Sequence, residues 1–99
     1  MGFATNSSTV VFAGAQLILL TPDLAEALGV ERGLLVVSAG RGSPAEQSGL
    51  RTGDVLVSVD GRALASPIVF LRTIEQSENR EVKLQLVRKK QRVTTVLRW

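Results

Sequence analysis

Few side chains in this sequence could do chemistry, and those present lack the partners that catalysis needs. The 99 residues contain no His and no Cys, which removes the usual general base, the thiol nucleophile and the commonest metal ligand. Ser43 lies in Arg-Gly-Ser-Pro rather than in the Gly-x-Ser-x-Gly sequence of a nucleophile elbow. The sequence therefore predicts a protein that is not an enzyme, with no catalytic residue, no metal site and no cofactor.

The acidic residues support the same prediction. No two of them are spaced as an acid and base pair. Those on or beside the expected helices are Glu26, Glu31, Glu75 and Glu78. Asp54 and Asp60 lie in expected turns, which explain their presence.

Positive charge gathers near the end of the chain, whose net charge is +3; the cluster is Arg88, Lys89, Lys90, Arg92 and Arg98. Such a cluster could bind nucleic acid or an anionic membrane surface, and it would then be retained on heparin or DNA in a salt-dependent way. We favour the other interpretation, a solvated hairpin tip, because no aromatic residues interleave the charges. No apolar run is long enough to span a bilayer, and residues 1–20 do not read as a signal peptide.

The densest pattern lies at residues 42–61 and predicts several elements in close succession. Ser43-Pro44 suits the cap and first position of a short helix. Gly49 suits the left-handed residue that ends such a helix. A buried strand is expected over Val55–Val59, and Asp60-Gly61 is a strong hairpin signal.

This pattern resembles the signature of PDZ domains, in which Gly-Ser-Pro-Ala-x-x-x-Gly-Leu-x-x-Gly-Asp-x-Leu-x-x-Val-x-Gly runs from a helix into the next strand. Phe12–Leu17 and Leu20–Val30 resemble the beginning of PDZ domains attached to HtrA/Deg-type serine proteases. The resemblance covers residues 10 to 98 and implies the circularly permuted strand order of that bacterial group. In that order Val93–Arg98 takes the place beside the loop that an N-terminal strand fills in other PDZ domains.

The pattern of apolar and turn residues predicts one small α+β domain, a sandwich or partial barrel, and the resemblance implies a PDZ-like partial β-barrel or sandwich of five to six strands. One long and one or two short helices are expected to cap it. Residues 1–9 are expected to be a flexible segment and residues 10–99 the PDZ domain. The expected helices are Pro22 to Leu28, Pro44 to Ser48 and Pro67 to Ser77, and the expected strands include residues 34–39, 55–59, 82–86 and 93–97.

The resemblance also implies a site. PDZ domains bind an extended peptide by strand addition, and Phe12–Ala15 matches the loop that holds the peptide's terminal carboxylate through backbone N–H groups. The strand Ala15–Leu19 would be the sheet edge, and the long helix would be the other wall. The candidate peptide-binding residues are Phe12, Ala13, Gly14, Ala15, Gln16, Leu17, Ile18, Leu19, Ile68, Leu71 and Ile74.

Without the resemblance, residue spacing favours simpler interpretations of the same segments. Gly14 between two alanines could mark only a β-bulge. An apolar stripe such as Ile68, Leu71 and Ile74 usually faces the core rather than a pocket.

Two positions depart from the family pattern. Related domains usually carry Leu and Val or Ile where this chain has Ala13 and Ala15. The smaller side chains imply a deeper pocket for the last peptide residue, unless Phe12, Leu17 or Ile74 refills the space.

Pro67 stands near the start of the groove helix, where other PDZ domains often place a His that selects Ser or Thr. We therefore expect peptides or unfolded protein C-termini with large apolar end residues as partners, and no nucleic acid. The chain's own Leu97–Trp99 could also serve a neighbouring copy, if those residues leave the hairpin. The resemblance implies the substrate-recognition or regulatory domain of an HtrA-like serine protease in the periplasm or cell envelope, with a stand-alone adaptor as the alternative.

Overall fold

The computed structural model describes residues 9–99. The flexible segment predicted at residues 1–9 lies outside this range except for Thr9, which is the first residue of a strand. Within the described range the elements are β1 (Thr9–Phe12), β2 (Ala15–Leu19), α1 (Pro22–Leu28), β3 (Leu34–Ala39), α2 (Pro44–Gln47), β4 (Val55–Val59), β5 (Arg62–Ala63), α3 (Pro67–Gln76), β6 (Glu81–Arg88) and β7 (Gln91–Arg98).

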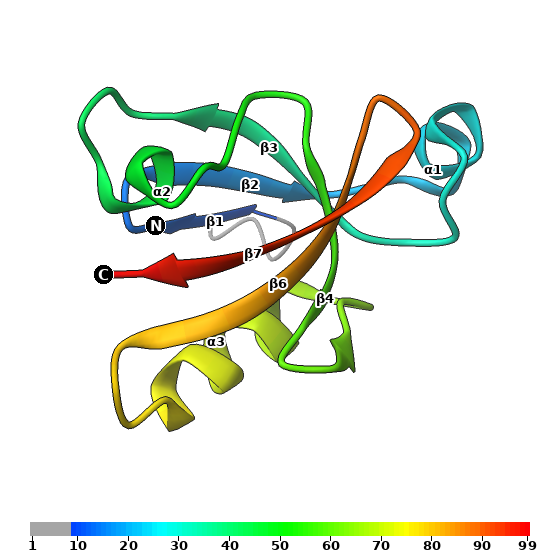
Figure 1. Ribbon diagram of the computed structural model, residues 1–99. Coiled ribbons are helices and arrows are strands. Elements are labelled where there is room, and N and C mark those ends of the chain that lie inside the picture. Colours follow the sequence, from blue (N-terminus) through cyan, green and yellow to red (C-terminus); the bar gives the residue numbers. More distant parts are fainter. Residues whose placement is uncertain (1–8) are drawn as a thin grey trace, which may run out of the picture.

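All strands belong to one antiparallel sheet with the order β1-β2-β3-β4-β6-β7, and β5 pairs with β4 (Figure 1). The α+β class is confirmed. The described strands number seven rather than five or six, because the run before Thr21 divides at Gly14 and a two-residue strand follows Asp60-Gly61.

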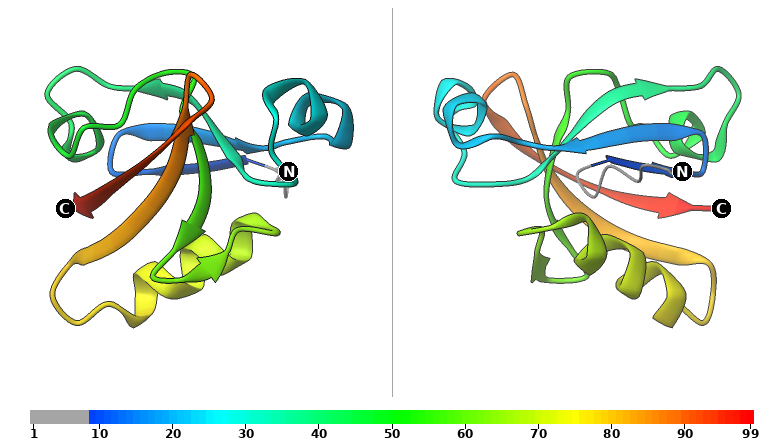
Figure 2. Two further views of the ribbon diagram at one scale, coloured as in Figure 1. Left: turned by 45° about the vertical axis from the view of Figure 1, so that its right-hand side comes forward. Right: turned by 180° about the vertical axis from the view of Figure 1, so that it is seen from behind.

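The sheet is strongly curled (Figure 2), so the end of β7 returns to the end of β1. There the rings of Phe12 and Trp99 lie 5.0 Å apart, measured between centroids. The predicted proximity of the N-terminal loop and the C-terminal hairpin is therefore confirmed.

The helix boundaries follow the expected local signals. Thr21 Oγ1 accepts a hydrogen bond from the Leu24 N–H, and Ser43 Oγ accepts one from the Glu46 N–H, each at 3.2 Å. These bonds satisfy N–H groups that have no partner within the helix. Gly29 ends α1 with a φ of +76°, a conformation that costs glycine little. In the described range no helix has the length and apolar character needed to span a membrane.

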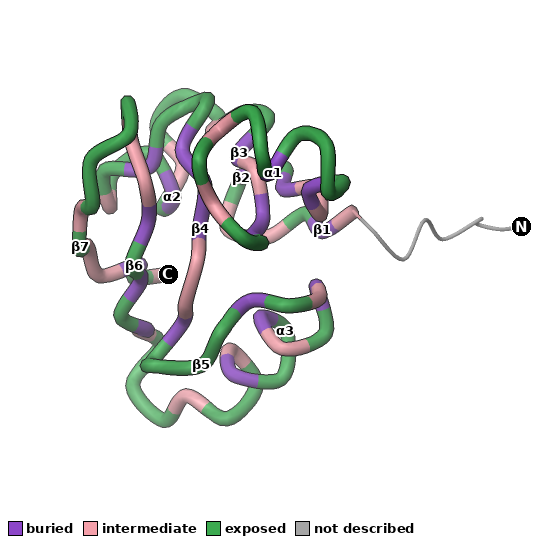
Figure 3. Tube along the Cα trace, turned by 90° about the vertical axis from the view of Figure 1, so that its right-hand side faces the viewer, coloured by how far each residue is buried: buried purple, intermediate pink, exposed green. Residues whose placement is uncertain are grey.

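The core is a continuous apolar cluster inside the curled sheet, and α3 covers one side of it (Figure 3). Buried side chains come from nearly every element, and the largest are Leu17, Leu34, Leu56, Leu64, Phe70, Leu84, Leu86 and Leu97. A smaller cluster of Leu20, Ala25 and Val55 packs α1 against the sheet.

The prediction of a solvated basic tip is wrong for Arg88. Asp54 is only 1% exposed, and Arg88 Nε and Nη2 donate to its two carboxylate oxygens at 2.8 Å. Arg88 also donates to the Gly49 carbonyl at 2.7 Å. Hydrogen bonding to Asp54 raises the pKa of Arg88, an effect that partial burial opposes. This bidentate pair ties β6 to the turn before β4, whereas Lys89 and Lys90 remain exposed.

Candidate functional site

The loop between β1 and β2 is a tight two-residue turn. Ala13 has a φ of +54° and Gly14 a φ of +85°, and positive φ at both positions is what a type I′ hairpin loop requires. A Cβ atom on Gly14 would lie 2.2 Å from Ser43 Cβ, so the close approach of α2 also requires glycine here. Gly14 therefore marks a turn between two strands, not a bulge within one.

The carbonyl groups of this loop attach it to the next layer of the fold. The Ala45 N–H donates to the Ala13 carbonyl at 3.0 Å, and the Gly40 N–H donates to the Gly14 carbonyl at 2.9 Å. The start of α2 thus supports the loop from behind.

The N–H groups of the loop have fewer hydrogen-bond partners among the described residues than its carbonyl groups have. Among the described residues, no backbone carbonyl or side chain accepts a hydrogen bond from the N–H of Ala13 or Gly14. Two adjacent donors on a supported turn can bind an anion such as a carboxylate. Ala15 lies directly after them, and its side chain is buried in the core.

The strand β2 is flanked on both sides in this structure. On one side Ala15 to Leu19 pair with β3, and on the other Ala15 to Ile18 pair with β1. The expectation that Ala15–Leu19 forms a free sheet edge is therefore wrong for this structure, because β1 is the edge strand. The break at Gly14 was visible in the sequence, but nothing there indicated that the preceding residues would fold back onto β2.

The helix α3 is buried on one side, and part of its apolar stripe is exposed on the other. Pro67, Phe70 and Thr73 are buried, whereas Ile68 is 52% exposed and Leu71 40% exposed. Of the three predicted wall residues, Ile74 alone packs partly against the core. The exposed Ile68 and Leu71 are free of the core.

Three aromatic rings connect the loop to α3 and to the C-terminal strand. The Phe12 ring lies 6.1 Å from that of Phe70 and 5.0 Å from that of Trp99, both edge to face. Such contacts add to the stabilisation from apolar burial. The sequence indicated Phe12 for the site, but the spacing carried no signal that Trp99 would lie beside it.

Ala13 and Ala15 belong to or pack against the same core as the three side chains that were expected to refill the space beside them. Leu17 is buried, and Phe12 and Ile74 pack against the same core. A cavity of about 1070 Å³ lies elsewhere, between the segment around Gly29 and strands β4 and β6. Its lining mixes acidic residues such as Glu26 with basic residues such as Arg32.

The side chains considered for catalysis have structural partners instead. Ser43 caps α2, and Asp60 Oδ1 accepts a hydrogen bond from the Lys83 N–H at 2.7 Å. Within residues 9–99 no three acidic side chains gather in a way that could hold a metal ion.

Known proteins resemble this chain in sequence. A family model described as PDZ domain matches residues 35–88, more than half of the chain. The protein named "Probable periplasmic serine endoprotease DegP-like" of Rhizobium meliloti is 39% identical over 63 residues, which cover 62% of this chain and 12% of that protein. "Magnetosome formation protease MamE" of Paramagnetospirillum magneticum is 34% identical over 88 residues, covering 86% and 12%.

Solved structures resemble it in fold. The HtrA-type protease AlgW with decapeptide superposes with a TM-score of 0.71 and 25% identity, covering 91% of this chain and 29% of that one. The HtrA3 PDZ domain bound to a phage-derived ligand (FGRWV) superposes with a TM-score of 0.76 at 22% identity, covering 91% and 85%, and this second likeness shows the fold alone.

The chain spans 12 to 16% of the length of the curated relatives it matches. It contains none of their catalytic protease domain, and the chain belongs to the PDZ domain family.

Proposed function

We propose that this PDZ domain binds extended peptides with a free terminal carboxylate. The peptide strand would add to β2, the N–H groups of the Ala13–Ala15 loop would hold the carboxylate, and α3 would form the other wall. In this arrangement the domain serves substrate recognition or regulation in an HtrA-like serine protease. The stand-alone adaptor remains the alternative.

The observation that carries this proposal is the pair of free donors at Ala13 and Gly14. Both N–H groups lack an acceptor among the described residues, and the carbonyl groups of the same residues are bound from behind. A carboxylate offers acceptors for both donors, and a hydrogen bond to a charged group is stronger than one between neutral groups. The AlgW structure is that of the protease with a decapeptide, which supports a peptide as the source of that carboxylate.

The test compares two forms of one labelled decapeptide ending in Phe, one with a free carboxylate and one with a terminal amide. Each charge-assisted hydrogen bond contributes about 1.5–3 kcal/mol, so the amide should bind at least about tenfold more weakly. Fluorescence anisotropy measures both affinities. Equal affinities would contradict the proposed carboxylate site.

A matched pair of glycine variants tests whether the preference for the acid form arises at the Ala13–Ala15 loop. Gly14 and Gly61 are each the second residue of a two-residue turn, with φ values of +85° and +82°. A Cβ at Gly14 would collide with Ser43, whereas none of the surrounding atoms lies within 4 Å of a Cβ at Gly61. We expect Gly14→Ala to lose the preference for the acid form and Gly61→Ala to keep it.

The end residue of the ligand is proposed to be large and apolar. Ala13 and Ala15 provide little side-chain volume beside the loop, and the exposed Ile68 and Leu71 of α3 offer an apolar wall. Each methylene that fills apolar space contributes about 0.8 kcal/mol, so peptides ending in Phe or Leu should outrank those ending in Val or Ala. A peptide array in which Val outranks Phe would reject this preference.

A further inference from the structure

The strand β1 covers the edge of β2 that the proposed ligand would use. It pairs with β2 over four positions, from Thr9 opposite Ile18 to Phe12 opposite Ala15. Figures 1 and 3 show β1 on the side of β2 that faces α3. A peptide that pairs with β2 must therefore take the place of β1.

The direction of β1 is also that of the proposed ligand. β1 is antiparallel to β2 and runs toward the Ala13–Ala15 loop. A peptide whose carboxylate is held by this loop must run the same way, because its last residue lies at the loop. β1 differs in that its chain turns at Ala13 and Gly14 instead of ending there, which leaves the two proposed carboxylate donors free.

The side chains of β1 alternate as those of an added peptide would. Val10, opposite Leu17, is 5% exposed and belongs to the core, whereas Val11, opposite Gln16, is 72% exposed. The ring of Phe12 points inward to Phe70. β1 therefore fills the apolar side of the groove with alternate side chains, which is how strand addition achieves specificity.

The attachment of β1 is light. The strand has four residues, one of which is buried. Its main side-chain contacts are those of Val10 in the core and of the Phe12 ring with Phe70 and Trp99, and none of its side chains forms a hydrogen bond or ion pair with the rest of the described chain. Short edge strands with few buried contacts open locally at low free-energy cost.

We propose that β1 is a built-in competitor that closes the peptide groove until a ligand displaces it. This inference rests on the proposed function, since it concerns the same edge of β2. Apparent peptide affinity is then the affinity of the open groove reduced by the fraction of molecules in which β1 has left β2.

The first experiment weakens β1 at one of two adjacent valines. Val10→Ala removes two buried methyl groups that hold β1, so more of the protein has an open groove, and the acid-ended Phe decapeptide should bind about tenfold more tightly. Val11→Ala, in the same strand but on its exposed face, should bind this peptide as the unmodified protein does. Thermal melts of both variants verify that the domain stays folded.

The second experiment locks β1 in place. The chain has no Cys, so the double variant Val11→Cys/Gln16→Cys can form one disulfide across two directly opposite residues. Its oxidised form should bind the decapeptide at least about tenfold more weakly than its own reduced form, because the closed groove cannot open. Gln85→Cys/Thr94→Cys, which joins opposite exposed residues of β6 and β7, should bind equally in both forms.

The outcomes separate this inference from the proposed function. Equal binding by the oxidised and reduced forms of Val11→Cys/Gln16→Cys would overturn the competition while leaving peptide binding intact. Val10→Ala binding no more tightly than Val11→Ala would overturn it as well. If none of the proteins, Val10→Ala included, binds the acid-ended decapeptide, the proposed function fails and the role of β1 fails with it.

Discussion

The two hairpins at the ends of this domain use the same loop for different purposes. β1 and β2 are joined by Ala13 and Gly14, and β6 and β7 by Lys89 and Lys90; all four residues have positive φ. Such loops match the right-handed twist of the strands. The hairpins differ in how firmly the outer strand is held.

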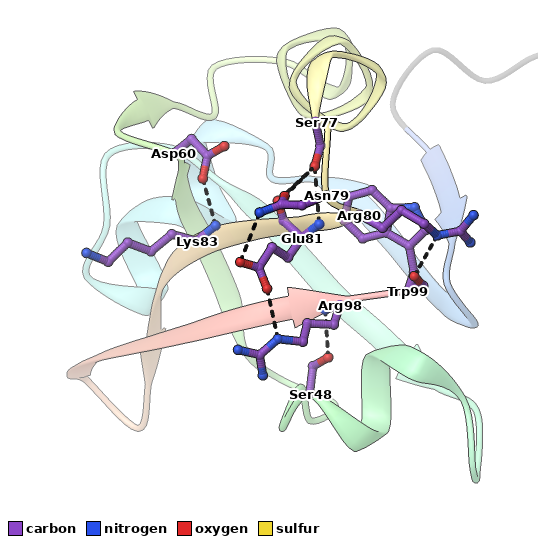
Figure 4. A network of polar contacts seen from close by, with 9 residues as sticks. All are labelled: Ser48, Asp60, Ser77, Asn79, Arg80, Glu81, Lys83, Arg98 and Trp99. Carbon is purple, nitrogen blue, oxygen red and sulfur yellow. Dashed lines mark hydrogen bonds and ion pairs between the residues drawn. The ribbon is translucent and has the colours of Figure 1, made fainter.

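The outer strand β7 has several independent anchors (Figure 4). Thr95 Oγ1 donates to the Ser48 carbonyl at 2.7 Å, and the Arg98 N–H donates to Ser48 Oγ at 3.0 Å. The Trp99 N–H donates to the Arg80 carbonyl at 3.1 Å. β1 has no side-chain bond of this kind to the described residues, so we assign β7 to the permanent framework and β1 to the part that the proposed ligand displaces.

The largest expected difference comes from removing each outer strand. Deletion of Thr94 to Trp99 removes the buried Leu97 and most of an eight-residue pairing, and we expect it to abolish the cooperative melt followed by circular dichroism. Within the described part of the chain, deletion of residues 1–11 removes one buried side chain, Val10. That burial contributes about 1.5–3 kcal/mol, so this protein should still melt cooperatively at a lower temperature. An unchanged melt after the first deletion would reject the assignment of β7 to the framework.

The second prediction compares how much each of the two ion pairs made by the β6–β7 hairpin contributes to stability. Arg88→Met leaves the buried carboxylate of Asp54 without its charged partner, and we expect a loss of roughly 3 kcal/mol in the free energy of unfolding. Arg98→Met breaks an exposed pair with Glu81, which should cost about 1 kcal/mol or less. Denaturant titrations measure both.

The double variant Asp54→Asn/Arg88→Met is the control for the first of these changes. It removes the buried charge together with its partner, so part of the lost stability should return. Equal losses for Arg88→Met and Arg98→Met would show that burial of Asp54 has no energetic consequence.

The smallest expected effects come from optimising the loops. Asn-Gly is the preferred type I′ sequence, and Lys89→Asn/Lys90→Gly should raise the global free energy of unfolding by about 1 kcal/mol. Ala13→Asn should instead slow hydrogen exchange of the β2 amides that face β1, with little change in global stability, because β1 opens locally. An equal global gain from both loops would indicate that β1 is released only when the whole domain unfolds.

Much of the fold could be predicted because its signals are local. Thr21 and Ser43 cap their helices with N–H groups three residues away, and Asp60-Gly61 forms a turn within adjacent residues. The candidate loop at Phe12–Ala15 was found through the resemblance to PDZ domains, and its glycine has a steric reason in Ser43. The additional strand β5 is two exposed residues long, and such a short exposed strand has no apolar pattern to detect.

The sequence alone determined the helices and the main strands, because caps, turns and apolar alternation act over a few neighbouring residues. Its resemblance to a known signature indicated the PDZ family. Only the tertiary structure decided that Arg88 pairs with Asp54, that Phe12 meets Phe70 and Trp99, and that β1 covers β2. The physical reason is that contacts between distant residues depend on how the whole sheet curls. An apolar run such as the one before Gly14 also satisfies the same alternation whether its edge is left free or is paired with its own chain.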